Sequence, residues 1–326
     1  MSDVNFETNL FRENRVSEIR LSLLGPPNLT RDNAPLKIGR RKAFALLSYL
    51  AVTDQPQRRE SLATLFWPDS GSSLAFSYLR RDLAVINKAL GPGWLEADRE
   101  QVTLIEQEGL WIDVLAFQQL LQECKTHGHP SDQGCPRCIP LLSKAAALYR
   151  GDFMMGFSLP DSHAFDDWQL FQAERIRREL DSALQRLVQW HSAQREFELA
   201  AGYARRRLAL DPLDEGAHCQ LMRLCAWSGR RSAALRQYQE CVAILEDQLG
   251  VPPQQATTEL YQAIQAGRAP PPPDARQTPE SVPESQPCAE PPPFLQQDIP
   301  VETPIFVARE SELAQLDQFL QQALDG

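Results

Sequence analysis

The sequence predicts a mainly α-helical protein with a small β component, divided into two folded domains and a linker. The length of 326 residues favours more than one domain. Apolar residues recur at spacings of three and four through most of residues 113–266, which is the period of an amphipathic helix. Short apolar and β-branched runs bounded by Gly, Pro, Asn and Asp are found between residues 17 and 105, and they predict strands.

The bulk composition is that of a cytoplasmic globular protein. Hydrophobic residues make up 43% of the chain, which is enough to build a core. The sequence contains no apolar run of about 18 residues, so we expect no contact with a membrane. Residues 1–16 lack the apolar centre of a signal peptide and are interpreted as a disordered lead. Seven cysteines without a secretory signal favour reduced thiols or metal ligands over disulfides.

The first domain is expected to alternate short strands with three helices. Gly25-Pro26-Pro27 ends the first strand, Trp67-Pro68 ends the second helix, and Gly91-Pro92-Gly93 ends the third. The expected segments, in chain order, are a strand at Ile19–Leu24, a strand at Leu36–Ile38, helices at Arg41–Ala51, Arg59–Phe66 and Leu74–Leu90, and strands at Trp94–Ala97 and Gln101–Ile105.

The helix Leu74–Leu90 has one apolar and one polar face. Its apolar stripe follows spacings of 4, 3 and 4 residues and consists of Leu79, Leu83, Ile86 and Leu90. The residues that fall away from this stripe are Ser77, Arg80, Arg81, Ala84 and Lys88. Three helices followed by a β-hairpin is the layout of a winged helix-turn-helix, in which the later helix enters the major groove of DNA.

The candidate DNA-binding residues follow from this layout. A guanidinium can hold guanine through two hydrogen bonds, so Arg80 and Arg81 are the strongest candidates for reading bases. Ser77 and Tyr78 lie on the first turns and could contact phosphates or bases. Side chains suited to phosphates are Arg40, Arg41, Lys42 and Lys88, and Arg99, at the expected hairpin tip, could probe the minor groove.

Local charge agrees with a DNA contact, although the chain as a whole carries a net charge of -10. Between Leu36 and Leu90, nine basic residues face four acidic ones, which leaves a local charge of +5. The alternative is that Arg80 and Arg81 belong to an ordinary solvated helix face, and the neighbouring Asp82 is an objection to the DNA interpretation.

The second domain is expected to be all-helical. Gly151, Pro160, Pro212 and Gly229 are among the residues that separate its segments. The expected helices are 113–124, 137–149, 161–192, 196–209, 213–227, 230–248 and 253–266. The pairs Arg195–Leu210 and Gly229–Leu245 resemble tetratricopeptide units, which stack because none buries its apolar face alone. Such units bind a peptide or a neighbouring domain, or they only pack on each other.

A cysteine and histidine cluster lies between the first two of these helices. It contains Cys124-x2-His127 and Cys135-x2-Cys138, separated by seven residues. Paired x2 spacings present two ligands each to a tetrahedral zinc ion, so these four residues are the candidate ligands, with His129 as an alternate. A closed shell of four ligands would make the zinc structural. The alternative is an inter-helix loop with incidental cysteines. Three further cysteines on apolar helix faces are expected in the core: Cys219, Cys225 and Cys241.

Two long stretches resemble known bacterial families. IRLSLLGPPNL, RRKAFALLSYLAV, RRESLATLFWPD, LRRDLAVINKALG and WLEADREQVTL resemble the OmpR-type winged helix of SARP-type transcriptional regulators. ALYRGDFMMGFSLPDSHAFDDW and ARRRLALDPLDEGAHCQLMRL are similar to the bacterial transcriptional activator domain. The resemblance implies a winged helix at residues 17–110 and a tetratricopeptide-like helical domain at residues 111–267. It also implies promoter DNA and RNA polymerase as partners.

The end of the chain changes in composition. Twelve of the 36 residues between Ala269 and Pro304 are proline, and we interpret residues 268–304 as a semi-extended linker. Residues 305–326 contain FVARESEL, which resembles the start of a signal-transduction ATPase module, with Ala308 in the place of a glycine. No phosphate-binding G-x-x-x-x-G-K-[ST] motif is present, so we expect no nucleotide in this chain. The alternative is a fortuitous amphipathic helix.

These observations predict a sequence-specific DNA-binding transcriptional regulator, most simply an activator. We expect the helical domain to support homodimerisation and contact with RNA polymerase. The sequence lacks H-E-x-x-H, G-x-S-x-G and G-x-G-x-x-G, and we expect no enzyme activity. Two alternatives remain open. The chain could be a protein-interaction module with vestigial DNA binding, or the N-terminal part of an ATP-dependent signalling regulator.

Overall fold

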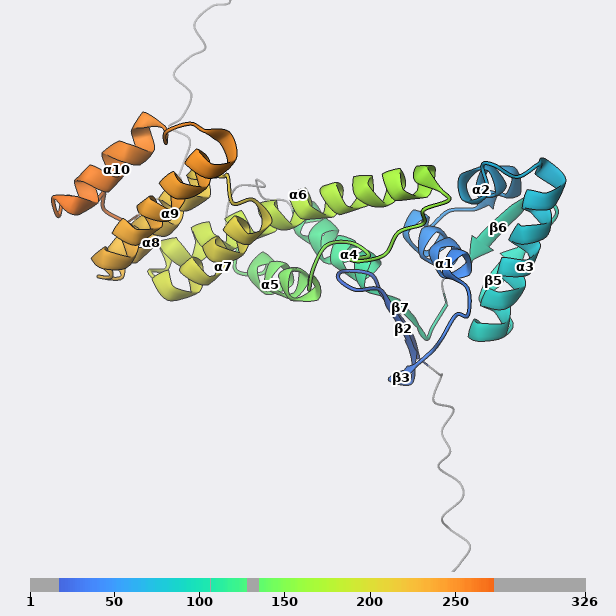
Figure 1. The fold of residues 1–326 in the computed structure, drawn as a ribbon. Helices are drawn as coiled ribbons and strands as arrows, with labels where there is room; N and C mark the ends of the chain where they lie inside the picture. The colour runs from blue at the N-terminus through green and yellow to red at the C-terminus, as the bar shows by residue number, and fades with distance from the viewer. Residues whose placement is uncertain (1–17, 106, 128–134, 273–326) are drawn as a thin grey trace, which may run out of the picture. The chain divides into compact units, whose positions relative to one another are not determined.

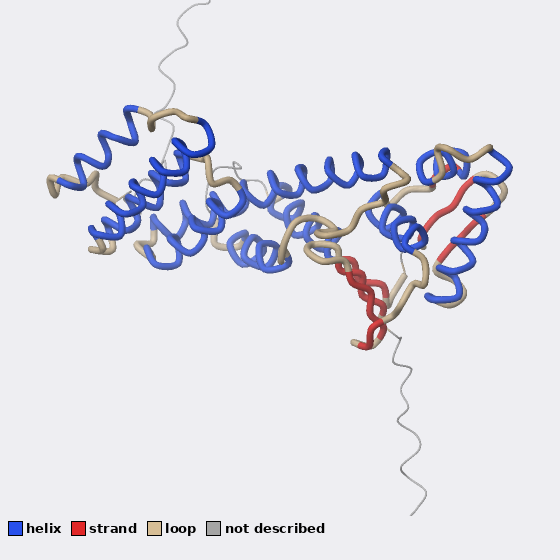
Figure 2. Tube along the Cα trace, in the orientation of Figure 1, coloured by secondary structure: helices blue, strands red, loops and turns tan. Residues whose placement is uncertain are grey.

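A computed structural model of the chain describes residues 18–105, 107–127 and 135–272 (Figure 1). Within these ranges the chain forms seven strands and ten helices, and Figure 2 shows that helix predominates. The strands are β1 (Ile19–Ser22), β2 (Asn28–Arg31), β3 (Ala34–Pro35), β4 (Gln57–Arg58), β5 (Leu95–Ala97), β6 (Gln101–Leu104) and β7 (Leu110–Ile112). The expected lead 1–16, the linker beyond residue 272 and the expected ATPase start at 305–326 lie outside the described residues.

The ten helices divide into a group of three and a group of seven. The first group is α1 (Arg41–Thr53), α2 (Arg59–Phe66) and α3 (Ser72–Leu90). The second group is α4 (Asp113–Thr126), α5 (Cys138–Leu148), α6 (His163–Ala193), α7 (Phe197–Leu210), α8 (Glu215–Trp227), α9 (Arg231–Leu249) and α10 (Gln255–Gln265). The fold is therefore mainly α with a small β component, as the sequence predicts, and it consists of a winged helix-turn-helix followed by a tetratricopeptide-like bundle.

Two small sheets flank the first three helices. The first sheet has the strand order β3-β2-β1-β7, in which β1 runs antiparallel to β2 and parallel to β7. The second has the order β4-β6-β5 and contains the predicted hairpin, whose strands pair from Leu95 opposite Leu104 to Ala97 opposite Val102. The strand-turn-strand prediction for this region is confirmed.

The predicted strand at Leu36–Ile38 is wrong. The chain instead turns at Asp32 and Asn33, whose φ angles are 51° and 65°, and a hairpin with such a turn pairs the residues on its two sides. That pairing joins Arg31 to Ala34 and Thr30 to Pro35, so the strands are β2 and β3. Leu36 and Ile38 follow the hairpin and pack partly buried against the core.

The third helix has a buried stripe and a fixed end. Leu79, Leu83, Ile86 and Leu90 are all buried, as the spacing predicts. At the C-terminus of α3, Arg31 donates hydrogen bonds to the carbonyl oxygens of Leu90 (2.5 Å) and Ala89 (3.3 Å). The last carbonyls of a helix have no partner within the helix, so this arginine from β2 satisfies two of them.

The seven predicted helices of the second group are confirmed, with ends that differ from the prediction by at most about two residues. Residues from the five helices α6, α7, α8, α9 and α10 form a second hydrophobic core. Small residues on α7, such as Ala200, Ala201 and Ala204, allow these helices to approach closely. Cys219, Cys225 and Cys241 are buried, so their predicted role in packing is confirmed. Among the residues described, no helix combines the length and the apolar character needed to cross a membrane.

The winged helix and the first part of the helical bundle share one hydrophobic core. The ring of Phe66 on α2 lies 5.4 Å from that of Phe165 on α6, and Tyr49 on α1 lies 4.8 Å from Trp168. In addition, the buried carboxylate of Asp113 accepts hydrogen bonds from the backbone N–H groups of Leu23 (2.8 Å) and Leu24 (3.0 Å). Because aromatic rings and buried charged hydrogen bonds connect the two parts, we expect them to behave as one cooperative unit.

Candidate DNA-binding surface and His–Cys cluster

The exposed face of α3 carries four of the nine residues that the sequence predicts for base and phosphate contact. Ser77, Arg80, Arg81 and Lys88 are exposed, whereas Leu79 and its apolar partners on the same helix are buried. The face results from the helical period alone, because residues three and four apart share one side of the helix. A helix with a buried apolar stripe and a free cationic face can enter a groove without losing its packing.

Tyr78 orders the first half of this face. Its ring lies 6.2 Å from that of the buried Trp67, and the guanidinium of Arg81 lies 5.5 Å over the tyrosine ring. Arg80 stays close to its own helix, where Nε contacts the carbonyl oxygen of Phe76 at 3.4 Å. Arg81 is thus oriented by a cation–π contact, whereas Arg80 keeps more freedom.

Asp82 belongs to the buried side of α3 and not to the cationic face. Its side chain is 0% exposed and forms an ion pair with Nε of Arg40, the residue before α1. Burial raises the pKa of Asp82, although Arg40, Arg81 and Lys42 oppose this effect. The negative charge therefore points into the protein. The objection raised by its position next to Arg81 in the sequence does not apply.

The basic residues at the start of α1 are engaged in protein contacts. Nζ of Lys42 pairs with Asp161 at 2.8 Å and donates to the carbonyl oxygen of Phe66 at 2.5 Å. Arg41 is exposed, donates to the carbonyl oxygen of Ser158 at 3.0 Å, and lies 4.9 Å over the ring of Phe157. The structure therefore places Arg41 and Lys42 beside the helical bundle, and Arg40 against Asp82. No local sequence signal identifies Ser158 or Asp161 as their partners.

Arg99 lies at the turn of the β5–β6 hairpin and is exposed. The carboxylate of Asp98 orders this turn by accepting hydrogen bonds from the backbone N–H groups of Glu100 (2.7 Å) and Gln101 (2.6 Å). The hydrogen bonds from Gln101 and Glu100 lower the pKa of Asp98. The predicted position of Arg99 at the tip of a wing agrees with this geometry.

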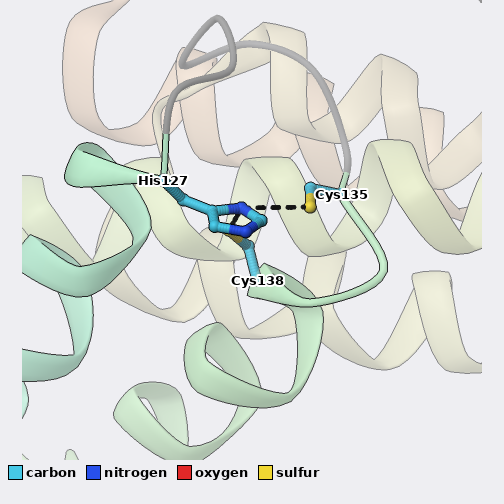
Figure 3. A group of neighbouring side chains, drawn as sticks. All are labelled: His127, Cys135 and Cys138. Carbon is cyan, nitrogen blue, oxygen red and sulfur yellow. Dashed lines mark hydrogen bonds between the residues drawn. The ribbon is translucent and has the colours of Figure 1, made fainter.

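A second group of side chains lies where α4 ends and α5 begins. His127 immediately follows α4, and Cys138 is the first residue of α5 (Figure 3). Nδ1 of His127 is 3.4 Å from Sγ of Cys135 and 3.5 Å from Sγ of Cys138, and the ligand atoms of the three residues all lie within 4.8 Å of one another. The fourth residue of the predicted set, Cys124, is not in this group. Its Sγ contacts the carbonyl oxygen of Cys138 at 3.7 Å.

The three thiols differ in their ease of ionisation. Burial and the neighbouring thiols of Cys124 and Cys135 raise the pKa of Cys138 to about 12. Burial also raises the pKa of Cys124. For Cys135, burial opposes ionisation, but hydrogen bonds from the N–H groups of Arg137 and Cys138 and the charge of Arg137 outweigh it, so its pKa lies below the ordinary value. His129, the alternate ligand of the sequence prediction, lies outside the described residues.

Comparison with known proteins places these features in a regulatory context. Residues 112–265 match the bacterial transcriptional activator domain. The chain is 26% identical over 257 residues to the regulatory protein AfsR of Streptomyces coelicolor, and 27% identical over 253 residues to AfsR of Streptomyces griseus. These alignments cover 77% and 76% of this chain but only 25% and 24% of the relatives, so the chain spans about a quarter of their length.

A solved structure has a similar fold. It is that of Mycobacterium tuberculosis EmbR in complex with a low-affinity phosphopeptide, with a TM-score of 0.58 and 20% sequence identity. The similarity covers 78% of this chain and 66% of the EmbR chain. Fold and matches together support a transcriptional regulator of the SARP type. We refer to residues 112–265, which include α4 to α10, as the activator domain, after the family model that they match.

Proposed function

We propose that this transcriptional regulator binds promoter DNA in a sequence-specific manner, with α3 in the major groove and the β5–β6 hairpin against the minor groove. The proposal rests on the exposed cationic face of α3, which lies opposite the buried apolar stripe of the same helix. In this arrangement Arg80 and Arg81 read bases, and Ser77, Tyr78 and Lys88 contact the backbone or neighbouring bases. Arg99 reaches the minor groove from the hairpin turn.

The contacts at the start of α1 refine the proposed roles. Arg40 supports α3 from behind through Asp82, and Arg41 and Lys42 hold the winged helix against the activator domain. We therefore assign phosphate binding mainly to Lys88 and the α3 face, and we assign Arg40, Arg41 and Lys42 a supporting role next to that surface. A phosphate contact by these three residues requires that they exchange or share their present partners.

The activator domain is proposed to provide homodimerisation and the contact with RNA polymerase. Support comes from the match of residues 112–265 to an activator domain and from exposed apolar side chains on its surface. The neighbouring residues Leu170 and Phe171 on α6 are 63% and 61% exposed. Adjacent exposed large apolar residues commonly mark protein contacts.

The proposal can be tested by selecting binding sites for the full chain from a pool of random duplexes. We expect enrichment of a short, repeated sequence motif. Replacing Arg80 or Arg81 with Ala is expected to weaken binding to the selected duplex by about 5- to 150-fold, since a bidentate base contact contributes about 1–3 kcal/mol of discrimination. Arg178→Ala removes the same charge from an exposed position on α6 and serves as the matched control.

Two readouts separate base reading from simple charge attraction. Loss of a base contact changes the preferred sequence at one position, whereas loss of a phosphate contact weakens all duplexes similarly and reduces the salt dependence. If the selection enriches no motif, or if Arg80→Ala and Arg81→Ala bind as the Arg178→Ala control does, the proposed DNA-reading role of α3 is wrong. A protein-interaction module would then be the better description.

A further inference from the structure

The His–Cys cluster lies at a junction between two helices of the activator domain, away from the α3 surface. His127 closes α4, and Cys135 and Cys138 form the turn that begins α5, where the N–H of Cys138 donates to the carbonyl oxygen of Cys135 at 2.9 Å.

The separations between the three ligand atoms match those around a tetrahedral zinc ion. Zinc–nitrogen bonds of 2.0–2.1 Å and zinc–sulfur bonds of about 2.3 Å at tetrahedral angles place a nitrogen and a sulfur ligand about 3.6 Å apart. The observed separations from Nδ1 of His127 are 3.4 Å to Cys135 and 3.5 Å to Cys138. Both sulfurs therefore lie at nearly the distance that a shared ion requires.

Hydrogen bonding alone explains this geometry less well. A ring nitrogen of histidine carries either one proton or one lone pair, so it makes one good hydrogen bond. Here two sulfur atoms approach the same Nδ1 at nearly equal distances (Figure 3). A single cation between the three atoms accounts for both contacts at once. Imidazole and thiolate ligands favour zinc over magnesium or calcium, which prefer oxygen.

Cys124 lies beside this cluster, at the end of α4. It lies one helical turn before His127 on α4, is 2% exposed, and its sulfur contacts the backbone of Cys138. Residues three apart on a helix share a face, so Cys124 and His127 are both directed towards the start of α5. A fourth sulfur ligand would complete a closed shell of the kind found in structural zinc sites.

We propose that His127, Cys135 and Cys138, with Cys124 as the fourth ligand, bind one structural zinc ion that joins the end of α4 to the start of α5. A closed shell leaves no position for a reactive water, so the ion would stabilise the activator domain and take no part in catalysis. The free energy of zinc binding would contribute directly to the stability of this helix pair.

The test is a metal analysis of the full chain, purified under reducing conditions and supplied with zinc. We expect about one zinc per chain, and replacement by cobalt should give the thiolate-to-metal charge-transfer bands and the intense visible bands of tetrahedral coordination. Cys135 is half-buried, so Cys135→Ser should disturb packing little and yet lose most of the zinc. Cys225→Ser, at a buried cysteine on α8, is the matched control and should keep it.

X-ray absorption and two further variants test the zinc site even if Cys135→Ser does not fold. X-ray absorption of the unmodified chain should show sulfur neighbours at about 2.3 Å and nitrogen at about 2.0–2.1 Å. The proposal is overturned if the reduced chain binds no zinc, if Cys135→Ser and His127→Ala bind as much zinc as the control, or if Cys135 and Cys138 form a disulfide in place of the site. Full zinc content in Cys124→Ser would overturn the assignment of the fourth ligand.

Discussion

The shared core of the winged helix and the activator domain predicts a large loss of stability for Phe165→Ala. Phe165 is 0% exposed, and its ring lies 5.4 Å from Phe66, 5.4 Å from Trp168 and 6.2 Å from Phe157. Removing a fully buried phenylalanine costs about 3–5 kcal/mol through lost burial and the cavity that remains. Within that cost, we expect about 0.5–1.5 kcal/mol to come from the pairing of Phe165 with Phe66 across the two domains.

Urea unfolding followed by circular dichroism measures this change, and a double-mutant cycle with Phe66→Ala isolates the pairing term. Leu249→Ala serves as the control, because Leu249 lies at the end of α9 and is 55% exposed, so its replacement should change stability by no more than about 0.5 kcal/mol. Tryptophan fluorescence should report the same midpoint as circular dichroism. A cost below about 1 kcal/mol for Phe165→Ala, or separate unfolding of the two domains in the unmodified chain, would refute the shared core.

Three further predictions concern single polar or ionisable side chains. Asp113→Asn places an amide donor against the N–H groups of Leu23 and Leu24, and should lower the unfolding free energy by about 2–4 kcal/mol in urea titrations. Arg31→Met removes the donor at the end of α3 and should cost about 1–2 kcal/mol by the same measurement, whereas Arg20→Met, at an exposed pair, should cost much less. Burial raises the pKa of Cys241 from 9.0 to about 11, so its contribution to stability is complete below about pH 9 and is lost as the pH rises towards 11. We expect the unmodified chain to lose about 2–3 kcal/mol over that range relative to Cys241→Ala, and identical pH profiles would contradict the assignment.

The helices were predictable from sequence because each carries its own period and its own end signals. The apolar stripe of α3 and the Gly91-Pro92-Gly93 stop define that helix without reference to any other segment. The short strands β4 and β7 were not predicted, because two or three residues carry no period. They become strands only through pairing with β6 and β1, which lie far from them in sequence.

Sequence spacing also predicted part of the candidate DNA-binding surface and of the His–Cys cluster, but not the contacts of the basic residues near α1. Helical spacing was sufficient to predict that Arg80, Arg81 and Lys88 would be exposed, and sequence spacing was sufficient to bring His127, Cys135 and Cys138 together. The engagement of the basic residues before and within α1 was not predictable, because their partners are remote. Arg40 meets a residue 42 positions later, and Arg41 meets one 117 positions later. Proximity of that kind is decided by the tertiary fold.

The common core of Phe66 and Phe165 also has a consequence for promoter architecture. If α3 binds DNA as proposed, the shared core and the contact between Phe66 and Phe165 would hold the activator domain at a fixed angle around the duplex. B-form DNA turns once in about 10–10.5 base pairs. Inserting about five base pairs between the operator and the polymerase site would therefore move the activator domain to the opposite side of the duplex, and about ten would return it. The chain would thus impose a helical phase on the promoters that it serves.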